Sequence, residues 1–384
     1  MKPARTPAPV KAKRTQRCLP GLLFIASASY LLSGWPSAAQ KPVAPPKKPK
    51  KEEITQTLQL PKELPSAVIG ETRRLTFHVT PLSARGLLSA QVREALKALT
   101  HETGNNPVLK IRAFVAGSGD LRRVRDLVSE VFAERRLPLP ALSLIQSGGL
   151  PLEGAQVVLE AIAQGKKEVN PEGLVFFSAP VATSDNPLDP VEPLAANSLE
   201  RLKAALKTAG SKPSDVVRLT CFLSSLDNIA ATRKLVEADF GRATLNYVQT
   251  QRTPSRAMGA CEAVAKLTWK TGQRVVMQPE TGEPLAALVS APRVVLTGTQ
   301  VSFGYQEANS RLAFERMQKA LEAIGVSGQD VAFAHFYPLA EPLAAQVRKI
   351  RPEFLRSSAG SLLLFEGLPG MDAGFAVDLV AVKE

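Results

Sequence analysis

The chain has 384 residues, 45% hydrophobic side chains and a formal net charge of +13, enough for two or three domains with buried cores. Residues 1–51 hold eleven Lys and Arg and no acid, which leaves 37 basic against 35 acidic side chains in the rest of the chain. A nearly neutral body argues against a polyanion-binding protein, so we expect no nucleic-acid partner.

The N-terminus resembles an export signal. A basic stretch, KAKRTQR (11–17), precedes an apolar run, and Ser37 and Ala39 supply the small residues of a cleavage site. Pro20 interrupts the run, which at about 17 residues is short for a membrane span. We predict a signal peptide at 1–39, a Pro/Lys linker at 40–54, and an exported protein without a stable membrane span. An uncleaved N-terminal membrane anchor is the alternative.

Beyond the linker, one series of elements occurs three times. An amphipathic helix ending in glycine is followed by a strand, a second helix and two further strands. The helix reads VREALKALTHETG (92–104), LERLKAALKTAG (199–210) and FERMQKALEAIG (314–325). Glycines at 104, 210 and 325 place the copies 106 and 115 residues apart, which is the size of a small domain.

The other expected elements follow the same order in each copy. The first has strands at 73–82, 107–115, 140–149 and 155–163 and a helix at 119–132. The second has strands at 173–182, 215–223, 256–267 and 274–277 and a helix at 226–240. The third has strands at 292–301, 330–339, 359–368 and 374–382 and a helix at 341–354. We predict three α+β units, at residues 55–166, 167–280 and 281–384, with helices covering sheets.

Two cysteines follow the signal segment, Cys221 and Cys261, both in predicted apolar strands. Cysteines in such positions are more often buried thiols than a bridge, although export would permit a disulfide. The histidines have no ligand spacing with cysteine or acid, so we expect no metal site, and no motif calls for a cofactor.

The second copy resembles the RidA/YjgF family. Its helix ending in Ala-Gly, then DVVRLTCFL, a helix ending in Phe and the turn TPSRA follow the family order. PALSLIQSGGLPLEGAQVVLEAIA in the first copy and SAGSLLLFEGLPG in the third match the family more loosely. The resemblance implies a chorismate-mutase-like fold that forms homotrimers. We therefore predict an intramolecular pseudo-trimer with a central β-barrel-like core and helices outside, acting as a monomer.

The resemblance also implies hydrolysis of 2-imino acids in clefts between units, where an arginine of a Pro-Ala-Arg-Ser turn binds the substrate carboxylate. TPSRA aligns Arg256 with this position, whereas the other copies have Leu142 and Gly360 there. Arg256 is thus the candidate catalytic residue, or a surface arginine without a ligand. Glu160 and Glu262 are candidates for the family's glutamate near the last strand, where the third copy keeps only Asp378.

An arginine also recurs eighteen residues after the start of each central strand, at Arg125, Arg233 and Arg348. This set indicates one anion-binding arginine per cleft, or else a solvated helix face. We expect a protein that binds a small carboxylate metabolite, with residual imine deaminase activity still open. A non-catalytic scaffold or interaction protein is the alternative.

Overall fold

The computed structural model describes residues 61–117, 119–279 and 282–384. The predicted signal peptide and linker lie outside these ranges. From residue 61 onward the chain forms one compact unit. No helix in the described ranges is long and apolar enough to cross a membrane. Below, residues 61–166, 167–279 and 282–384 are called the first, second and third segments.

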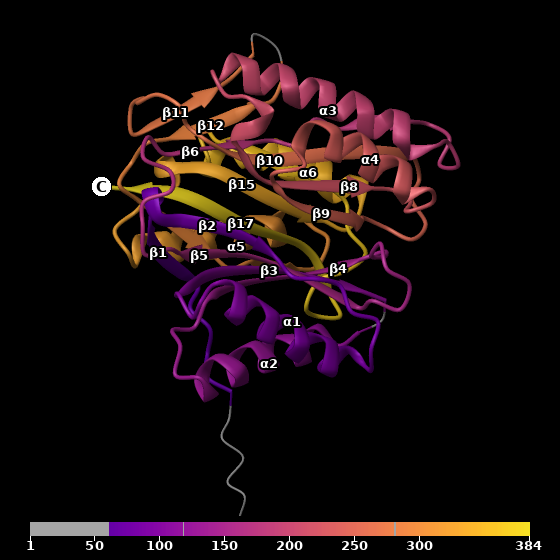
Figure 1. Cartoon of the computed structure of the whole chain (residues 1–384), viewed down its shortest axis with the longest axis horizontal. Helices are drawn as coiled ribbons and strands as arrows, with labels where there is room; N and C mark the ends of the chain where they lie inside the picture. The colour runs from indigo at the N-terminus through magenta and orange to yellow at the C-terminus, as the bar shows by residue number, and fades with distance from the viewer. Residues whose placement is uncertain (1–60, 118, 280–281) are drawn as a thin grey trace, which may run out of the picture. The chain divides into compact units, whose positions relative to one another are not determined.

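The fold is mixed α+β, as predicted, and contains three separate sheets (Figure 1). The first sheet has the order β2 (Leu75–Val79), β5 (Val157–Gln164), β3 (Val108–Ala116), β4 (Ala141–Ser147). The second has the order β11 (Arg274–Met277), β12 (Ala286–Val289), β6 (Leu174–Phe177), β10 (Ala257–Lys266), β8 (Val216–Leu223), β9 (Thr244–Gln249), and β7 (Ala182–Ser184) also pairs with β10. The third has the order β1 (Ala67–Glu71), β13 (Arg293–Thr297), β17 (Ala373–Lys383), β15 (Val331–Pro338), β16 (Ala359–Leu362), and β14 (Gln300–Phe303) also pairs with β17.

The same strand arrangement lies at the centre of each sheet. β3, β8 and β15 each pair in parallel with the edge strands β4, β9 and β16. Each also pairs antiparallel with the long strands β5, β10 and β17. A parallel pair needs a crossover, and in each segment the second helix supplies it.

Two strands lie in the sheet of another segment. β1, from the first segment, pairs with β13 of the third, and β12, from the third segment, pairs with β6 of the second. The chain therefore interlocks the segments at the edges of the sheets. The prediction of a β-barrel-like core is wrong in one respect. The described ranges form three separate sheets, and none of them closes on itself.

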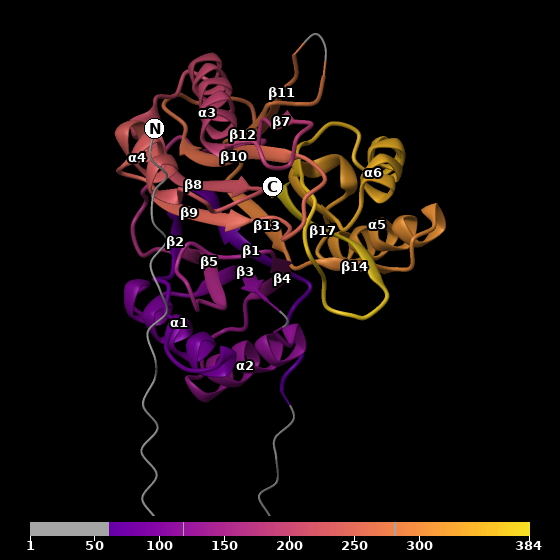
Figure 2. The same ribbon diagram turned by 90° about the vertical axis from the view of Figure 1, so that its right-hand side faces the viewer.

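Each segment contributes two helices, which lie outside the sheets (Figures 1 and 2). They are α1 (Leu88–Glu102) and α2 (Leu121–Glu134), α3 (Val191–Thr208) and α4 (Ile229–Phe240), and α5 (Glu307–Glu322) and α6 (Glu341–Phe354). Each pair packs on its own sheet through an apolar cluster. Successive strand residues point to opposite faces, so in β3 Ile111 and Val115 face the helices while Phe114 faces inward.

The inward faces of the three sheets pack against one another. One apolar cluster joins Phe77, Phe176 and Phe333, and another joins Phe114 and Phe222 with residues of the third segment. Each cluster thus takes side chains from all three segments. Because one interior is shared by all the sheets, the segments bury their inner faces jointly rather than one by one.

Strand β9 of the second segment was not predicted, and neither were β1 of the first segment and β12 of the third. Cys221 and Cys261 lie directly opposite each other on β8 and β10 and form a disulfide, so the expectation of two free buried thiols is wrong. The pair faces the helices, within the cluster between α3, α4 and the sheet.

Candidate functional site

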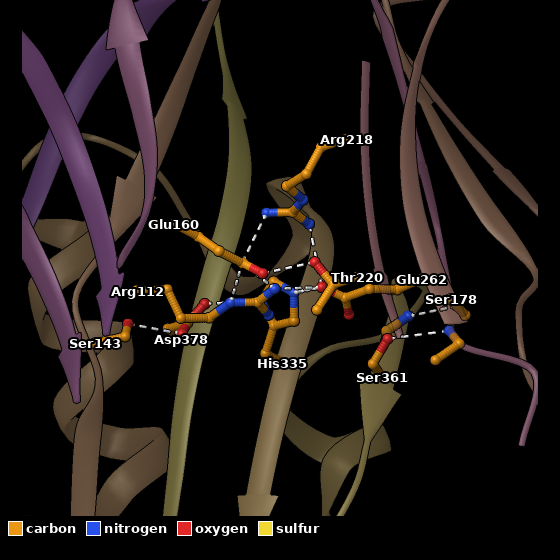
Figure 3. A network of polar contacts seen from close by, with 12 residues as sticks. Arg112, Ser143, Glu160, Ser178, Arg218, Thr220, Glu262, His335, Ser361 and Asp378 are labelled. Atoms are coloured by element: carbon orange, nitrogen blue, oxygen red, sulfur yellow. Dashed lines mark hydrogen bonds and ion pairs between the residues drawn. The ribbon is translucent and has the colours of Figure 1, made fainter. Parts of the chain in front are cut away.

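Charged side chains lie in the middle of strands that are otherwise apolar and buried. No more than 6% of any of these residues is exposed: Lys110, Arg112, Glu160, Arg218, Glu262 and Asp378. Charges can be buried at this depth only when partners replace the lost water. The strands bring these partners together between the two inner apolar clusters, and Figure 3 shows the resulting network.

The strand register sets the positions of the carboxylates. Glu160 lies opposite Arg112 in the first sheet, and Glu262 lies opposite Thr220 in the second. In the third sheet Asp378 lies opposite His335. The long strands β5, β10 and β17 therefore each place one acid at the corresponding point of the interior.

Arg112 joins the first and second sheets. Its Nε donates to Glu160 Oε2 at 2.8 Å, and its Nη2 donates to Glu262 Oε1 at 2.6 Å. Arg218 approaches the same acids, with Nη2 donating to Glu262 Oε1 at 3.1 Å. Thr220 Oγ1 donates to Glu160 Oε1 at 2.6 Å. Two guanidinium groups thus bridge carboxylates that the register places on different sheets.

Asp378 connects the first and third sheets. Lys110 Nζ donates to Asp378 Oδ1, and Ser143 Oγ and Tyr337 Oη donate to its Oδ2 at 2.7 and 2.8 Å. His335 lies between two acids, with Nδ1 2.9 Å from Asp378 Oδ1 and Nε2 3.2 Å from Glu262 Oε1. Ionised carboxylates only accept hydrogen bonds, so only a doubly protonated imidazole donates to both.

The cations keep the buried acids ionised. Burial alone would raise the pKa of Glu262, but Arg112 and His335 hold it well below its usual range. Burial would likewise raise the pKa of Asp378, which Lys110 and His335 lower well below the ordinary value. Burial lowers the pKa of Lys110 despite the nearby Asp378. The network is therefore a set of opposed charges whose interactions are mainly with one another.

The network provides no open site for a substrate. Its acids are at most 2% exposed and bind donors of the protein itself. The described ranges contain no group of three His, Cys, Asp or Glu that could hold a metal ion. The arrangement can fix three sheets against one another, and a ligand must bind elsewhere.

The cavities lie nearer the surface. One of about 190 Å³ lies between the second and third segments, and both Arg256 and Arg348 line it. Another, of about 330 Å³, lies between the first and third segments and includes Arg125 and Leu142. A larger cavity of about 810 Å³ is lined by second-segment residues.

Residues 166–271 match the family model described as Endoribonuclease L-PSP. This segment belongs to the RidA/YjgF family. Solved structures similar to the chain include a YjgF/YER057c/UK114-family protein of Mycobacterium tuberculosis (18% identity, TM-score 0.23) and a Rid-family protein of Yersinia pestis (19%, 0.27). A YjgF protein of Neisseria meningitidis is similar at 14% identity with a TM-score of 0.23. Each match covers 29% of this chain, and 99%, 99% and 95% of the respective relative. A comparison with curated proteins gives no match.

The RidA-like segment places Arg256 away from the position that its sequence motif suggests. In the parallel strand pairs, Leu142 lies beside Ile111, Leu245 beside Leu219 and Gly360 beside Ala334. The residue equivalent to Leu142 and Gly360 is therefore Leu245 on the unpredicted β9. Arg256 directly precedes β10, where its side chain is 58% exposed and its Nε lies 3.6 Å from Asp185.

At the third of these positions the backbone leaves no room for a side chain. A Cβ on Gly360 would lie 2.5 Å from the carbonyl oxygen of Ala334. An arginine at this position would require the strand pair to move. None of the three equivalent positions, 142, 245 and 360, carries the carboxylate-binding arginine that the family resemblance implies.

The remaining predicted site residues fall into two groups. Arg348 and Arg125 line the cavities described above, while Arg233 lies over the ring of Tyr247, 5.6 Å from its centroid. Glu160 and Glu262 belong to the buried network and are not brought together with any of these arginines. Arg256 and Arg348 are the two predicted residues that share a cavity.

The network itself was missed from the sequence, apart from its three acids. Lys110, Arg112 and Arg218 lie within apolar strands, where a charge signals a buried partner. Asp378 occupies the same place in its strand as Glu160 and Glu262 do in theirs. The sequence therefore held a signal for the network: three acids at matching places in their strands, and three cations inside apolar strands.

Proposed function

We propose that this chain is a non-catalytic RidA-like protein that binds a small carboxylate between its second and third segments. The observation that carries the proposal is the shared cavity of Arg256 and Arg348. The Arg256 and Arg348 side chains are 58% and 50% exposed, and their acidic partners lie 3.6 and 3.9 Å away. Both guanidinium groups remain available for the charge-assisted, bidentate pairing that a carboxylate offers.

We also propose that the three segments are copies of one RidA-like unit that associate as an intramolecular pseudo-trimer. The common strand arrangement and the matching register of Glu160, Glu262 and Asp378 support this interpretation. Two contacts between segments also come from matching strand positions. Ser143 of the first segment binds Asp378 of the third, and Asn246 of the second binds Glu160 of the first.

Catalysis of imine hydrolysis finds less support. Positions 142, 245 and 360 lack the arginine that would bind the imino-acid carboxylate, and Glu160 and Glu262 are held in the closed network. Export remains a proposal that rests on the N-terminal pattern. The disulfide between Cys221 and Cys261 supports it, because such bonds persist mainly in oxidising compartments.

The test is calorimetric titration with 2-oxobutyrate, comparing wild type with Arg256→Gln and Arg348→Gln. We expect saturable binding that at least one of the two variants weakens by about tenfold or more, the usual scale for one lost charge-assisted contact. Arg242→Gln, at an exposed turn outside the cavity, is the matched control and retains binding. If no heat of binding appears up to about 10 mM 2-oxobutyrate and the melting temperature does not rise, the proposed binding function is wrong and the scaffold function takes its place.

A second assay separates binding from turnover. The wild-type protein is incubated with a freshly generated 2-imino acid, and release of the 2-keto acid is measured against buffer. We expect no acceleration. An acceleration that Arg256→Gln abolishes would restore the deaminase hypothesis.

A further inference from the structure

We infer that the cavity between the second and third segments is selective for dicarboxylates, one carboxylate for Arg256 and the other for Arg348. This inference rests on the proposed function and specifies its ligand class. The two guanidinium groups reach the cavity from different elements, the start of β10 and the middle of α6. The ligand would therefore span the junction between segments.

Two arginines and one acid, Glu341, line the cavity, and the two arginines favour a ligand with two anionic groups once Glu341 is displaced. A planar guanidinium pairs with one carboxylate through two parallel hydrogen bonds, so a monocarboxylate satisfies only one of the two arginines. The second arginine would keep only its distant acidic neighbour. A dianion gives each arginine a partner of its own.

The acids now beside these arginines are easily displaced. Asp185 has a 97% exposed side chain and lies 3.6 Å from Arg256, while Glu341 is 56% exposed and lies 3.9 Å from Arg348. Exposed ion pairs of this kind contribute little stability. A ligand carboxylate that reaches hydrogen-bonding distance can replace them.

The rest of the lining suits a short carbon chain. Val181, Met258 and Leu363 provide apolar surface, and Thr183 and Ser255 provide hydroxyl groups. The volume of about 190 Å³ corresponds to roughly six water molecules at their share of liquid volume. This size suits a diacid of four or five carbons.

The experiment compares two five-carbon acids, glutarate and pentanoate, by calorimetric titration at fixed ionic strength. They differ only in the second carboxylate. We expect glutarate to bind at least about tenfold more tightly, since one charge-assisted pair is gained. Arg256→Gln and Arg348→Gln each bring glutarate down to the affinity of pentanoate, and the control Arg242→Gln leaves the ratio unchanged. Both arginines are half exposed or more, so the variants should fold, which circular dichroism checks.

The outcomes separate the two proposals. Equal affinities for glutarate and pentanoate would overturn dicarboxylate selectivity and leave the carboxylate site in place. Loss of glutarate binding in only one of the two variants would also overturn it, because the second carboxylate would then have another partner. Failure of both acids and of 2-oxobutyrate to bind would overturn the proposed function as well.

Discussion

Replacing Arg112 by methionine should destabilise the fold far more than removing any surface charge. The substitution removes the group that donates to Glu160 and Glu262 and leaves two buried acids short of a cation. Methionine is unbranched and flexible and replaces the aliphatic stem of the arginine, so the substitution removes mainly the guanidinium, which lies over the rings of Phe114 and Phe222 at 5.1 and 5.7 Å. The expected loss is thus mainly electrostatic.

The magnitude follows from the depth of the pair. Breaking a buried ion pair by removing one partner costs about 3–5 kcal/mol, because the other charge stays buried without compensation. Whole domains are stable by only about 5–15 kcal/mol. Arg112→Met should therefore lower the free energy of unfolding by a large fraction of the total and lower the denaturation midpoint clearly.

The assay is urea denaturation followed by circular dichroism, with Arg93→Met as the matched control. Arg93 pairs with Glu130 at 2.9 Å on the surface of the first segment, with 45% of its side chain exposed. Such surface pairs are worth about 0–1 kcal/mol. A cost for Arg112→Met below about 1 kcal/mol, equal to that of the control, would refute the reasoning.

A double substitution tests whether the contact itself is responsible. Glu160→Gln removes one buried charge and can still accept from Thr220 and Asn246, which now donate to Glu160 at 2.6 and 2.7 Å. Combined with Arg112→Met, it should cost less than the sum of the two single variants, since contacting residues are coupled. If the two single losses of unfolding free energy simply add in the double variant, the contact between Arg112 and Glu160 is not the source of the destabilisation.

Three further predictions concern stability and assembly. The pKa values of Glu262 and Asp378 are lowered in the folded protein, so the unfolded chain binds more protons than the folded chain in acid. The stability that these ionised acids contribute is therefore fully present above their ordinary pKa values of 4.5 and 3.8. It is lost as the pH falls through their folded pKa values. The melting temperature should fall in acid below about pH 4.5 and less steeply in Glu262→Gln, whereas identical profiles would contradict this. The disulfide closes a loop with a sequence separation of 40, so Cys221→Ala with Cys261→Ala should cost about 4 kcal/mol by loop entropy; an unchanged urea midpoint would exclude this. Sedimentation should give the mass of one chain, since the segments already bury their inner faces against one another, and a mass of three chains would contradict the intramolecular assembly.

Periodicity predicted most helices and strands because their patterns are local. α2, α4 and α6 lie close to the predicted ranges, and so do the central strands β3, β8 and β15. The short strands β1 and β12 were missed since their pairing is set by strands of other segments. Their sequences hold too few residues for a clear alternation.

The misplacement of Arg256 has a specific cause. The letters TPSRA resemble the family turn, but position in a sheet is set by strand pairing, and a one-residue slip moves every side chain to the other face. β9 occupies the place where the equivalent strand must lie, beside β8. Its sequence TLNYVQ carries no arginine, and the similar letters of TPSRA place their arginine eleven residues after Leu245.

The composition of the buried network explains what a single chain gains over three identical ones. The acids stand at matching register positions, and so do Lys110 and Arg218, but the position of Arg112 holds Thr220 in the second segment. Both Lys110 and Arg112 come from the first segment, and they reach Asp378 in the third and Glu262 in the second. The third segment places His335 where the first has Arg112. Three identical copies of the first segment would bury both Lys110 and Arg112 for every acid, which would leave an excess of buried cations. A balanced network of this kind needs segments that differ, and we propose that covalent linkage fixes the order in which they meet.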